Sequence, residues 1–113
     1  MIGLTLHPMK EVRIIIAGEH VKFVTSMLDS IQVRGYTIIH NISGKGHHGF
    51  HAHLTANDMD SLVMLITVVT EEKVEPIFAG LQPVFERYTG VMLVSDVFFS
   101  RAAPPSNKDG SQQ

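Results

Sequence analysis

The chain has 113 residues, of which 44% are apolar and 18% charged, with a formal net charge of −2. These values are typical of one globular domain and exclude an extensively disordered chain. The charge gives no basic field for binding nucleic acid, and no apolar run reaches the roughly 20 residues that span a bilayer, so direct membrane insertion is not expected. The absence of cysteine excludes disulfides and thiolate chemistry, and we expect a cytoplasmic protein.

The first half of the chain has the pattern of a strand, a helix and a second strand. Residues Glu11–Ala17 are rich in β-branched side chains, which favour a strand. Apolar residues then recur every three or four positions, which places them on one helical face. They are Val21, Val24, Met27, Leu28 and Ile31. Gly35 is expected just past the end of this helix, and Tyr36–Ile42 has the alternation of a strand.

The second half repeats this order. Ser61–Thr70 is almost wholly apolar, as in a strand covered on both faces. Glu71 and Glu72 have the charge that favours a helix start. The helix that follows is predicted to end at Gly90, before a last strand at Val91–Phe99.

One residue conflicts with the second helix. Inside a helix, the ring of Pro83 clashes with the carbonyl four residues earlier. We therefore expect a kink or a break near Ala79 and Gly80.

Two consecutive strand–helix–strand units predict an α+β, ferredoxin-like βαββαβ domain with a four-stranded antiparallel sheet. Right-handed crossovers place both helices on one face of that sheet, and the apolar third strand indicates that the other face is also covered, for example by another subunit. We expect the domain at residues 10–101, after an N-terminal extension at 1–9. A disordered tail is expected at 102–113.

A long loop, at about residues 43–60, connects the second and third predicted strands. Loops of this length are usually functional or disordered. Gly44, Gly46 and Gly49 allow positive φ angles and close approach to a ligand, so their amides can form an anion-binding nest. Lys45 adds a positive charge, which makes this segment a candidate phosphate site, with a flexible hairpin tip as the alternative.

Four histidines of the same loop, His47, His48, His51 and His53, could bind zinc or copper. No cysteine or intervening carboxylate joins them, so we expect no evolved metal site and prefer contacts with a ligand or partner. Catalytic residues are not expected either. Asp58 and Asp60 lack a partner acid, and Ser43 has no evident activating base.

Arg34-Gly35-Tyr36-Thr37, which leads through the second strand into Gly44-Lys45-Gly46, resembles the corresponding part of PII-like signalling proteins. The resemblance covers roughly Glu11–Arg101. It is closest to the branch associated with inorganic carbon uptake, which contains the SbtB proteins and the carboxysome-associated PII (CPII) proteins.

The resemblance implies a homotrimer that binds adenine nucleotides between subunits and has no catalytic activity or resident cofactor. The implied nucleotide-binding residues lie at the base of the long loop (the T-loop), in the turn before the last strand (the B-loop) and just beyond that strand. They are Asn41, Ser43, Gly44, Lys45, Gly46, Arg87, Tyr88, Thr89, Gly90, Val91 and Arg101. The rest of the T-loop is the implied partner-binding segment, with His47, His48, Gly49, Phe50, His51 and His53.

The B-loop is shorter here than in nitrogen-regulatory PII proteins, which makes ADP or AMP as plausible a ligand as ATP. Our leading hypothesis is a sensor of adenine nucleotides, with bicarbonate as a second candidate ligand. In this hypothesis its T-loop docks on a partner such as a bicarbonate transporter. The alternatives are a CutA-like or histidine-loop metal-binding protein and a nitrogen-regulatory PII-type protein.

Overall fold

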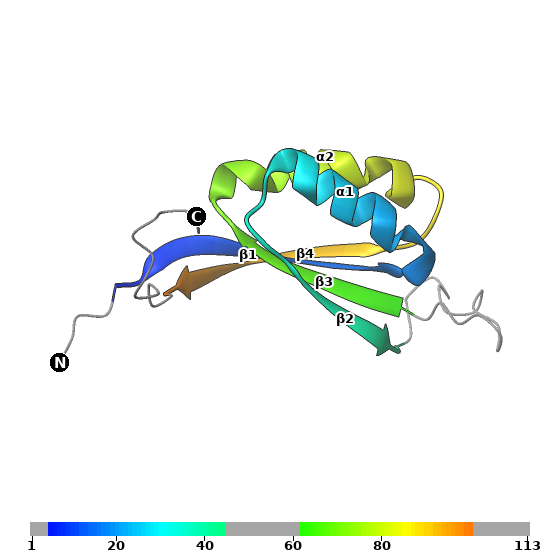
Figure 1. Ribbon diagram of the computed structural model, residues 1–113, viewed down its shortest axis with the longest axis horizontal. Coiled ribbons are helices and arrows are strands. Elements are labelled where there is room, and N and C mark those ends of the chain that lie inside the picture. The colour runs from blue at the N-terminus through cyan, green and yellow to red at the C-terminus, as the bar shows by residue number, and fades with distance from the viewer. Residues whose placement is uncertain (1–4, 45–61, 101–113) are drawn as a thin grey trace.

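The computed structural model describes residues 5–44 and 62–100 and confirms the α+β, ferredoxin-like order of elements (Figure 1). The elements are β1 (His7–Ala17), the 3-10 turn η1 (Gly18–His20), α1 (Val21–Ile31), β2 (Thr37–Ile42), β3 (Leu62–Val69), the 3-10 turn η3 (Glu71–Lys73), α2 (Val74–Phe85) and β4 (Val91–Phe99). β1 begins at His7, four positions before the predicted start, because its first residues pair with the end of β4.

The four strands form one antiparallel sheet in the order β2-β3-β1-β4. Both helices lie on the same face of it (Figure 1). The two central strands come from different strand–helix–strand units, so the two halves of the chain share one core. β2 and β4 are the edge strands.

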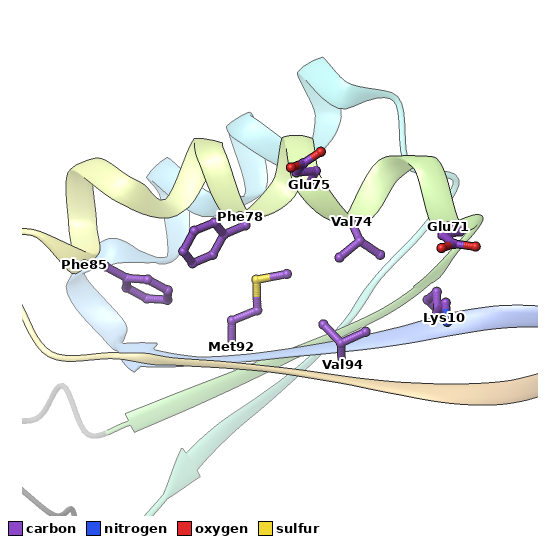
Figure 2. Close-up of a pocket in the computed structure, with 8 residues that line it drawn as sticks. All are labelled: Lys10, Glu71, Val74, Glu75, Phe78, Phe85, Met92 and Val94. Atoms are coloured by element: carbon purple, nitrogen blue, oxygen red, sulfur yellow. The ribbon is translucent and has the colours of Figure 1, made fainter.

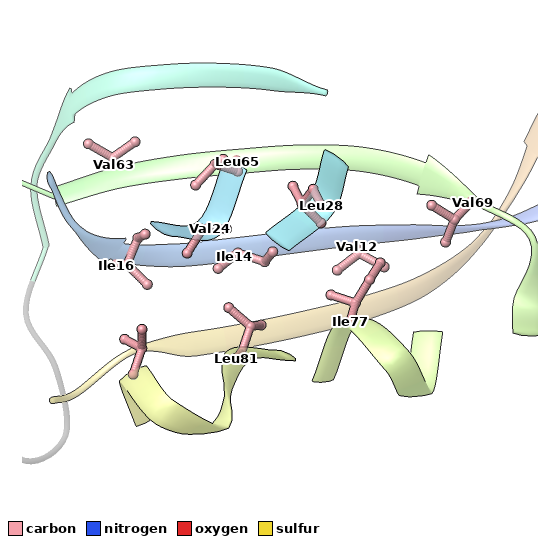
Figure 3. Close-up of a cluster of buried hydrophobic side chains, with 11 residues drawn as sticks. Val12, Ile14, Ile16, Val24, Leu28, Val63, Leu65, Val69, Ile77 and Leu81 are labelled. Atoms are coloured by element: carbon pink, nitrogen blue, oxygen red, sulfur yellow. The ribbon is translucent and has the colours of Figure 1, made fainter. Parts of the chain in front are cut away.

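The core lies between the helices and the sheet (Figure 3). Alternate residues of β1 and β3 point toward the helices, as the two-residue period of a strand requires. The buried cluster consists of Val12, Ile14, Ile16, Val24, Leu28, Val63, Leu65, Val69, Ile77, Leu81 and Val84. Complete burial of one such aliphatic side chain contributes roughly 1.5–3 kcal/mol, so this layer is the main source of stability.

The predicted end of α1 was wrong by three residues. Gln32, with a left-handed φ of 68°, caps the helix and donates its backbone N–H to the carbonyl of Asp29 at 2.9 Å. The ammonium group of Lys73 donates to the carbonyl oxygens of Ile31 (2.8 Å) and Gln32 (3.2 Å). Gly35 lies farther along, where its carbonyl accepts a hydrogen bond from the hydroxyl of Thr67 at 2.6 Å.

The predicted break in α2 was also wrong. The helix is continuous from Val74 to Phe85 and includes Pro83 in its last turn. The helix is not interrupted at Ala79, the residue whose carbonyl faces the Pro83 ring. Gly80 instead allows close packing of the two helices, because a Cβ atom there would lie 2.5 Å from Cγ of Met27. Gly90 follows the turn after the helix and does not end it.

The face of the sheet opposite the helices is also apolar. Residues directly opposite one another on antiparallel strands share a face, and the pairing places Ile39, Met64, Ile15 and Val91 in one row across all four strands. Ile39 and Val91 are 40% and 44% exposed. This row belongs to a surface that the described part of the chain leaves uncovered.

The next row on that face contains Ile66, Arg13 and Leu93. Leu93 is 49% exposed, and Arg13 forms an ion pair with Glu11 at 3.3 Å. An apolar sheet face of this extent marks an interaction surface in soluble proteins.

Candidate functional site

The base of the long loop is the end of β2. The pairing of β2 with β3 is regular at Ile39 and resumes at Ile42, which lies opposite Leu62. The register shifts between them, and Asn41 there has a left-handed φ of 58°. Such a bulge bends the strand and re-aims the residues that follow. Gly44, which is able to adopt a positive φ, is not in the left-handed region, and a Cβ atom there would meet nothing within 4 Å.

The turn after α2 is the second predicted binding segment, and its backbone is well anchored. The N–H groups of Arg87 and Tyr88 both donate to the carbonyl of Val84, at 3.2 and 2.8 Å. Gly90 packs closely against Phe85, since a Cβ atom would lie 2.7 Å from the ring and 3.2 Å from the carbonyl oxygen of Ile15. These contacts hold the turn in a defined conformation.

The ring of His20, in η1, packs against the ring of Tyr88 in this turn. The two centroids are 4.4 Å apart and the planes are tilted by 46°. His20 was not among the site residues predicted from the sequence, because nothing local relates it to a residue 68 positions later. Only the tertiary arrangement brings the two rings together.

The structure places the two predicted segments at the same end of the sheet but on opposite edges. Ile42 is opposite Leu62 and Val91 is opposite Ile15, near the end of β1. β3 and β1 lie between β2 and β4, so strand spacing separates the two edges by about 14 Å. Asn41, Ser43 and Gly44 therefore do not form a single cleft with Thr89, Gly90 and Val91 through the described residues of one chain.

The remaining predicted site residues lie outside the described residues. They are Lys45, Gly46, His47, His48, Gly49, Phe50, His51, His53 and Arg101. In residues 5–44 and 62–100, no group of three or more His, Cys, Asp or Glu side chains could hold a metal ion. Within the same ranges, no helix has the length and apolar character needed to span a membrane.

An open groove of about 640 Å³ lies between α2 and β4 (Figure 2). Phe78, Phe85 and Met92 line it with Val74 and Val94, while Lys10, Glu71 and Glu75 contribute charged groups. Phe78 is 45% exposed, although it lies on the apolar side of α2. The exposed Phe78 beside an edge strand could not be anticipated from helical periodicity.

Two carboxylates near this groove interact with Lys10. The Lys10 ammonium forms an ion pair with Asp96 across the β1–β4 pair. The hydrogen bond from Lys10 to Asp96 raises the Lys10 pKa above its ordinary value, and the nearby negative charge of Glu71 acts in the same direction. Because these groups are exposed, the pair contributes little to stability.

Comparison with known proteins identifies the class. The family model described as "Nitrogen regulatory protein P-II" matches residues 9–103. The chain therefore belongs to the PII family, whose ferredoxin-like fold it has. A comparison with curated protein sequences found no match.

Among solved structures, the chain is similar to CPII, a nitrogen regulatory PII-like protein from Thiomonas intermedia K12. The structure of that protein with ADP, AMP and bicarbonate is 45% identical in sequence, with a TM-score of 0.77, covering 88% of this chain and 94% of that chain. The structure with ADP and bicarbonate is 44% identical, with a TM-score of 0.75 and coverage of 88% and 95%. The apo form is 41% identical, with a TM-score of 0.73 and coverage of 88% and 100%.

Proposed function

We propose that this chain is a non-enzymatic PII-like signalling protein that binds adenine nucleotides between the subunits of a homotrimer. The observation that carries the proposal is its 45% identity with a CPII protein bound to ADP, AMP and bicarbonate. Similarity of that extent over 88% of the chain makes the same class of ligand the best hypothesis. ADP and AMP are the preferred ligands in this proposal, and ATP is a third.

The open sheet face supports the proposed assembly. It combines exposed Ile39, Val91 and Leu93 with half-buried Ile15, Met64 and Ile66. Burial of apolar surface is the main driving force of association. We infer that the sheets of three copies pack on these faces and supply the cover that the apolar β3 requires.

Binding between copies also agrees with the separation of the two predicted segments. The β2 edge and the β4 edge lie about 14 Å apart in one chain, as estimated from strand spacing. In an assembly, each edge can approach a segment of a neighbouring copy. In this proposal the phosphates contact backbone amides at Ser43, Gly44 and Gly46 and the ammonium of Lys45. Asn41 and the turn Arg87–Val91 complete the site, and Arg101 enters it from an adjoining subunit.

Regulation would act through the T-loop. A ligand shifts an equilibrium between two loop states only by its difference in affinity for them, so the phosphate contacts must form in one state and not in the other. The loop then docks on or leaves a partner through His47, His48, Gly49, Phe50, His51 and His53. We propose that the partner belongs to inorganic carbon uptake in the cytoplasm, and a bicarbonate transporter is the leading candidate.

Bicarbonate is the proposed second ligand. The related CPII protein was solved with bicarbonate alongside ADP, and a nest of loop amides suits a small anion. Calorimetric titration of ADP, AMP, ATP and bicarbonate, singly and in pairs, tests the proposal. Heat on addition of ADP, with an affinity that changes when bicarbonate is present, is expected. Absence of binding by all three nucleotides would refute it.

Nitrogen control is the second candidate, because the matching family model and the related CPII protein are both described as nitrogen regulatory. Titration with 2-oxoglutarate in the presence of ATP distinguishes the two. Strong binding of 2-oxoglutarate, together with no response to bicarbonate, would favour nitrogen control.

A further inference from the structure

We propose that His20 is a positioning residue for the turn Glu86–Gly90, acting through Tyr88, and that its protonation raises the affinity of that turn for an anion. This inference rests on the proposed function, because it concerns the B-loop of the proposed nucleotide site. It concerns a side chain that neither the sequence pattern nor the family resemblance singled out.

The first observation is the contact between the two rings. The backbone of Tyr88 is fixed from the helix side by the bond from its N–H to Val84. Its side chain is 46% exposed, and the His20 ring packs against the phenol ring with the two centroids 4.4 Å apart. A tilted aromatic pair at this distance is attractive beyond the area it buries. His20 therefore limits the positions open to Tyr88 and to Thr89 beside it.

The second observation is the state of the imidazole. The His20 side chain is only 13% exposed, and its Nε2 atom is buried with no hydrogen-bond partner among residues 5–44 and 62–100. A buried polar atom without a partner costs free energy, and such atoms are uncommon in native proteins. A change of charge or of hydrogen-bond partner at this atom should therefore have a large effect on the free energy of the local contacts.

The third observation identifies the partner that a proton would recruit. The nearest carboxylate oxygen is Oε2 of Glu19, 3.4 Å from Nε2, on a side chain that is 64% exposed and can move closer. Glu19 and the Tyr88 phenol are the ionisable groups that the described residues place against this ring. Protonated imidazole donates from both nitrogens, so it would pair with Glu19 while remaining packed on Tyr88.

The consequence for the turn follows from its location. A cationic imidazolium packed on the Tyr88 ring adds positive potential to a turn that is proposed to complete the site of an anionic nucleotide. The low accessibility of the ring reduces solvent screening of that charge. Protonation of this ring should therefore raise the affinity of the turn for an anion.

Calorimetry with ADP at pH 6 and pH 8 tests this in the full-length protein. His20→Phe keeps a ring but has no titrating nitrogen, whereas His20→Ala removes the ring as well. His7→Ala, at the opposite end of the sheet, is the matched control. All variants face the same ADP at each pH, so the titration of the nucleotide itself cancels between them.

We expect His20→Ala to bind ADP about tenfold more weakly at pH 8, since the lost ring contact is of the order of 1 kcal/mol. At pH 6 the loss should be about thirtyfold, because the charge is lost as well. His20→Phe should bind within about twofold of the unmodified protein at pH 8 and about threefold more weakly at pH 6, because it lacks the added charge. A merely structural role would leave the difference between His20→Phe and the unmodified protein equal at the two pH values. That result, or unchanged binding by His20→Ala, would overturn the proposal.

A second measurement separates this inference from the proposed function. The chain has two tyrosines, so NMR can follow the Tyr88 ring during a pH titration, with Tyr36 as the internal reference. We expect the Tyr88 signals to move with the midpoint of the His20 ring, and to lose that step in His20→Phe. If the unmodified protein binds no ADP, the proposed function fails, and this titration still decides whether His20 controls the turn. A Tyr88 signal that ignores His20 would overturn the inference.

Discussion

The hydroxyl of Thr67, in the middle of β3, donates a hydrogen bond to the carbonyl oxygen of Gly35 at 2.6 Å. Thr67 is only 2% exposed, and it is the buried polar residue among the described residues. The bond fixes the connection between α1 and β2 against the centre of the sheet. That connection contains Arg34–Thr37, the motif that resembles PII-like proteins. A hydrogen bond from a core strand therefore fixes the position of this motif.

Thr67→Val keeps the shape of the side chain but removes the donor. We expect a loss of about 1 kcal/mol of stability, the usual net contribution of one hydrogen bond. Hydrogen exchange should also become faster at the amides of Tyr36 and Thr37. Thr67→Ser retains the hydroxyl and is the control, in which exchange at these amides should stay near the original rate. Equal exchange in the two variants would contradict the role of the hydrogen bond.

Lys73 stabilises the end of α1 from the other half of the chain. Its ammonium donates to the carbonyls of Ile31 and Gln32, which carry the partial negative charge of a helix C-terminus. Lys73→Met should lower the free energy of unfolding by about 0.5–1 kcal/mol, as measured by urea denaturation. Lys22→Met changes an exposed lysine of α1 itself and should have a smaller effect; equal losses would show that the contact contributes nothing.

Glu72, in the 3-10 turn η3 before α2, should make the stability of the fold depend on pH. Hydrogen bonds from the Thr70 hydroxyl and from the backbone N–H of Glu72 itself lower the Glu72 pKa below its ordinary value of 4.5. A lowered pKa stabilises the fold above pH 4.5, and this contribution is lost as the pH falls through the folded-state pKa. Thr70→Val should therefore lower the melting temperature at pH 7, and its deficit should shrink at pH 3. A deficit that is independent of pH would argue against this linkage.

The open sheet face should govern assembly. Leu93→Asp places a charge in the row with Arg13 and Ile66, where burial against another copy would require costly desolvation. We expect this variant to fold but to sediment as a smaller species than the unmodified protein. Phe23→Asp, at a similarly exposed position on α1, is the control and should keep the original assembly. The same assembly in both variants would place the interface elsewhere.

Lys45 is the proposed cation of the phosphate site. Lys45→Ala should weaken ADP binding by on the order of 1–3 kcal/mol, the cost of losing a charge-assisted contact. Lys108→Ala removes a lysine near the end of the chain and controls for the change in net charge. Calorimetry that finds equal affinities in the two variants would remove Lys45 from the site.

Strong local patterns made most of the fold predictable. The β-branched runs and the helical spacing of Val24 and Leu28 identified every strand and both helices, and β4 matches the predicted Val91–Phe99. The helix ends were less predictable, because a left-handed Gln32 ended α1 before the permissive Gly35. Pro83 is accommodated inside α2, which continues to Phe85.

The residues of the candidate site were predictable only where a local sequence motif identifies them. Glycines and a lysine identified the loop base, and the family resemblance added the turn at Tyr88. The partnership of His20 with Tyr88 and the groove beside Phe78 arise from packing between distant segments. No local pattern contains that information.

Native mass spectrometry of the purified protein with ADP tests the central claim most directly. The account predicts an assembly of three chains that carries up to three ADP molecules, with no ADP on single chains. A monomer that binds ADP by itself, or a trimer that binds none, would contradict a nucleotide site formed between copies.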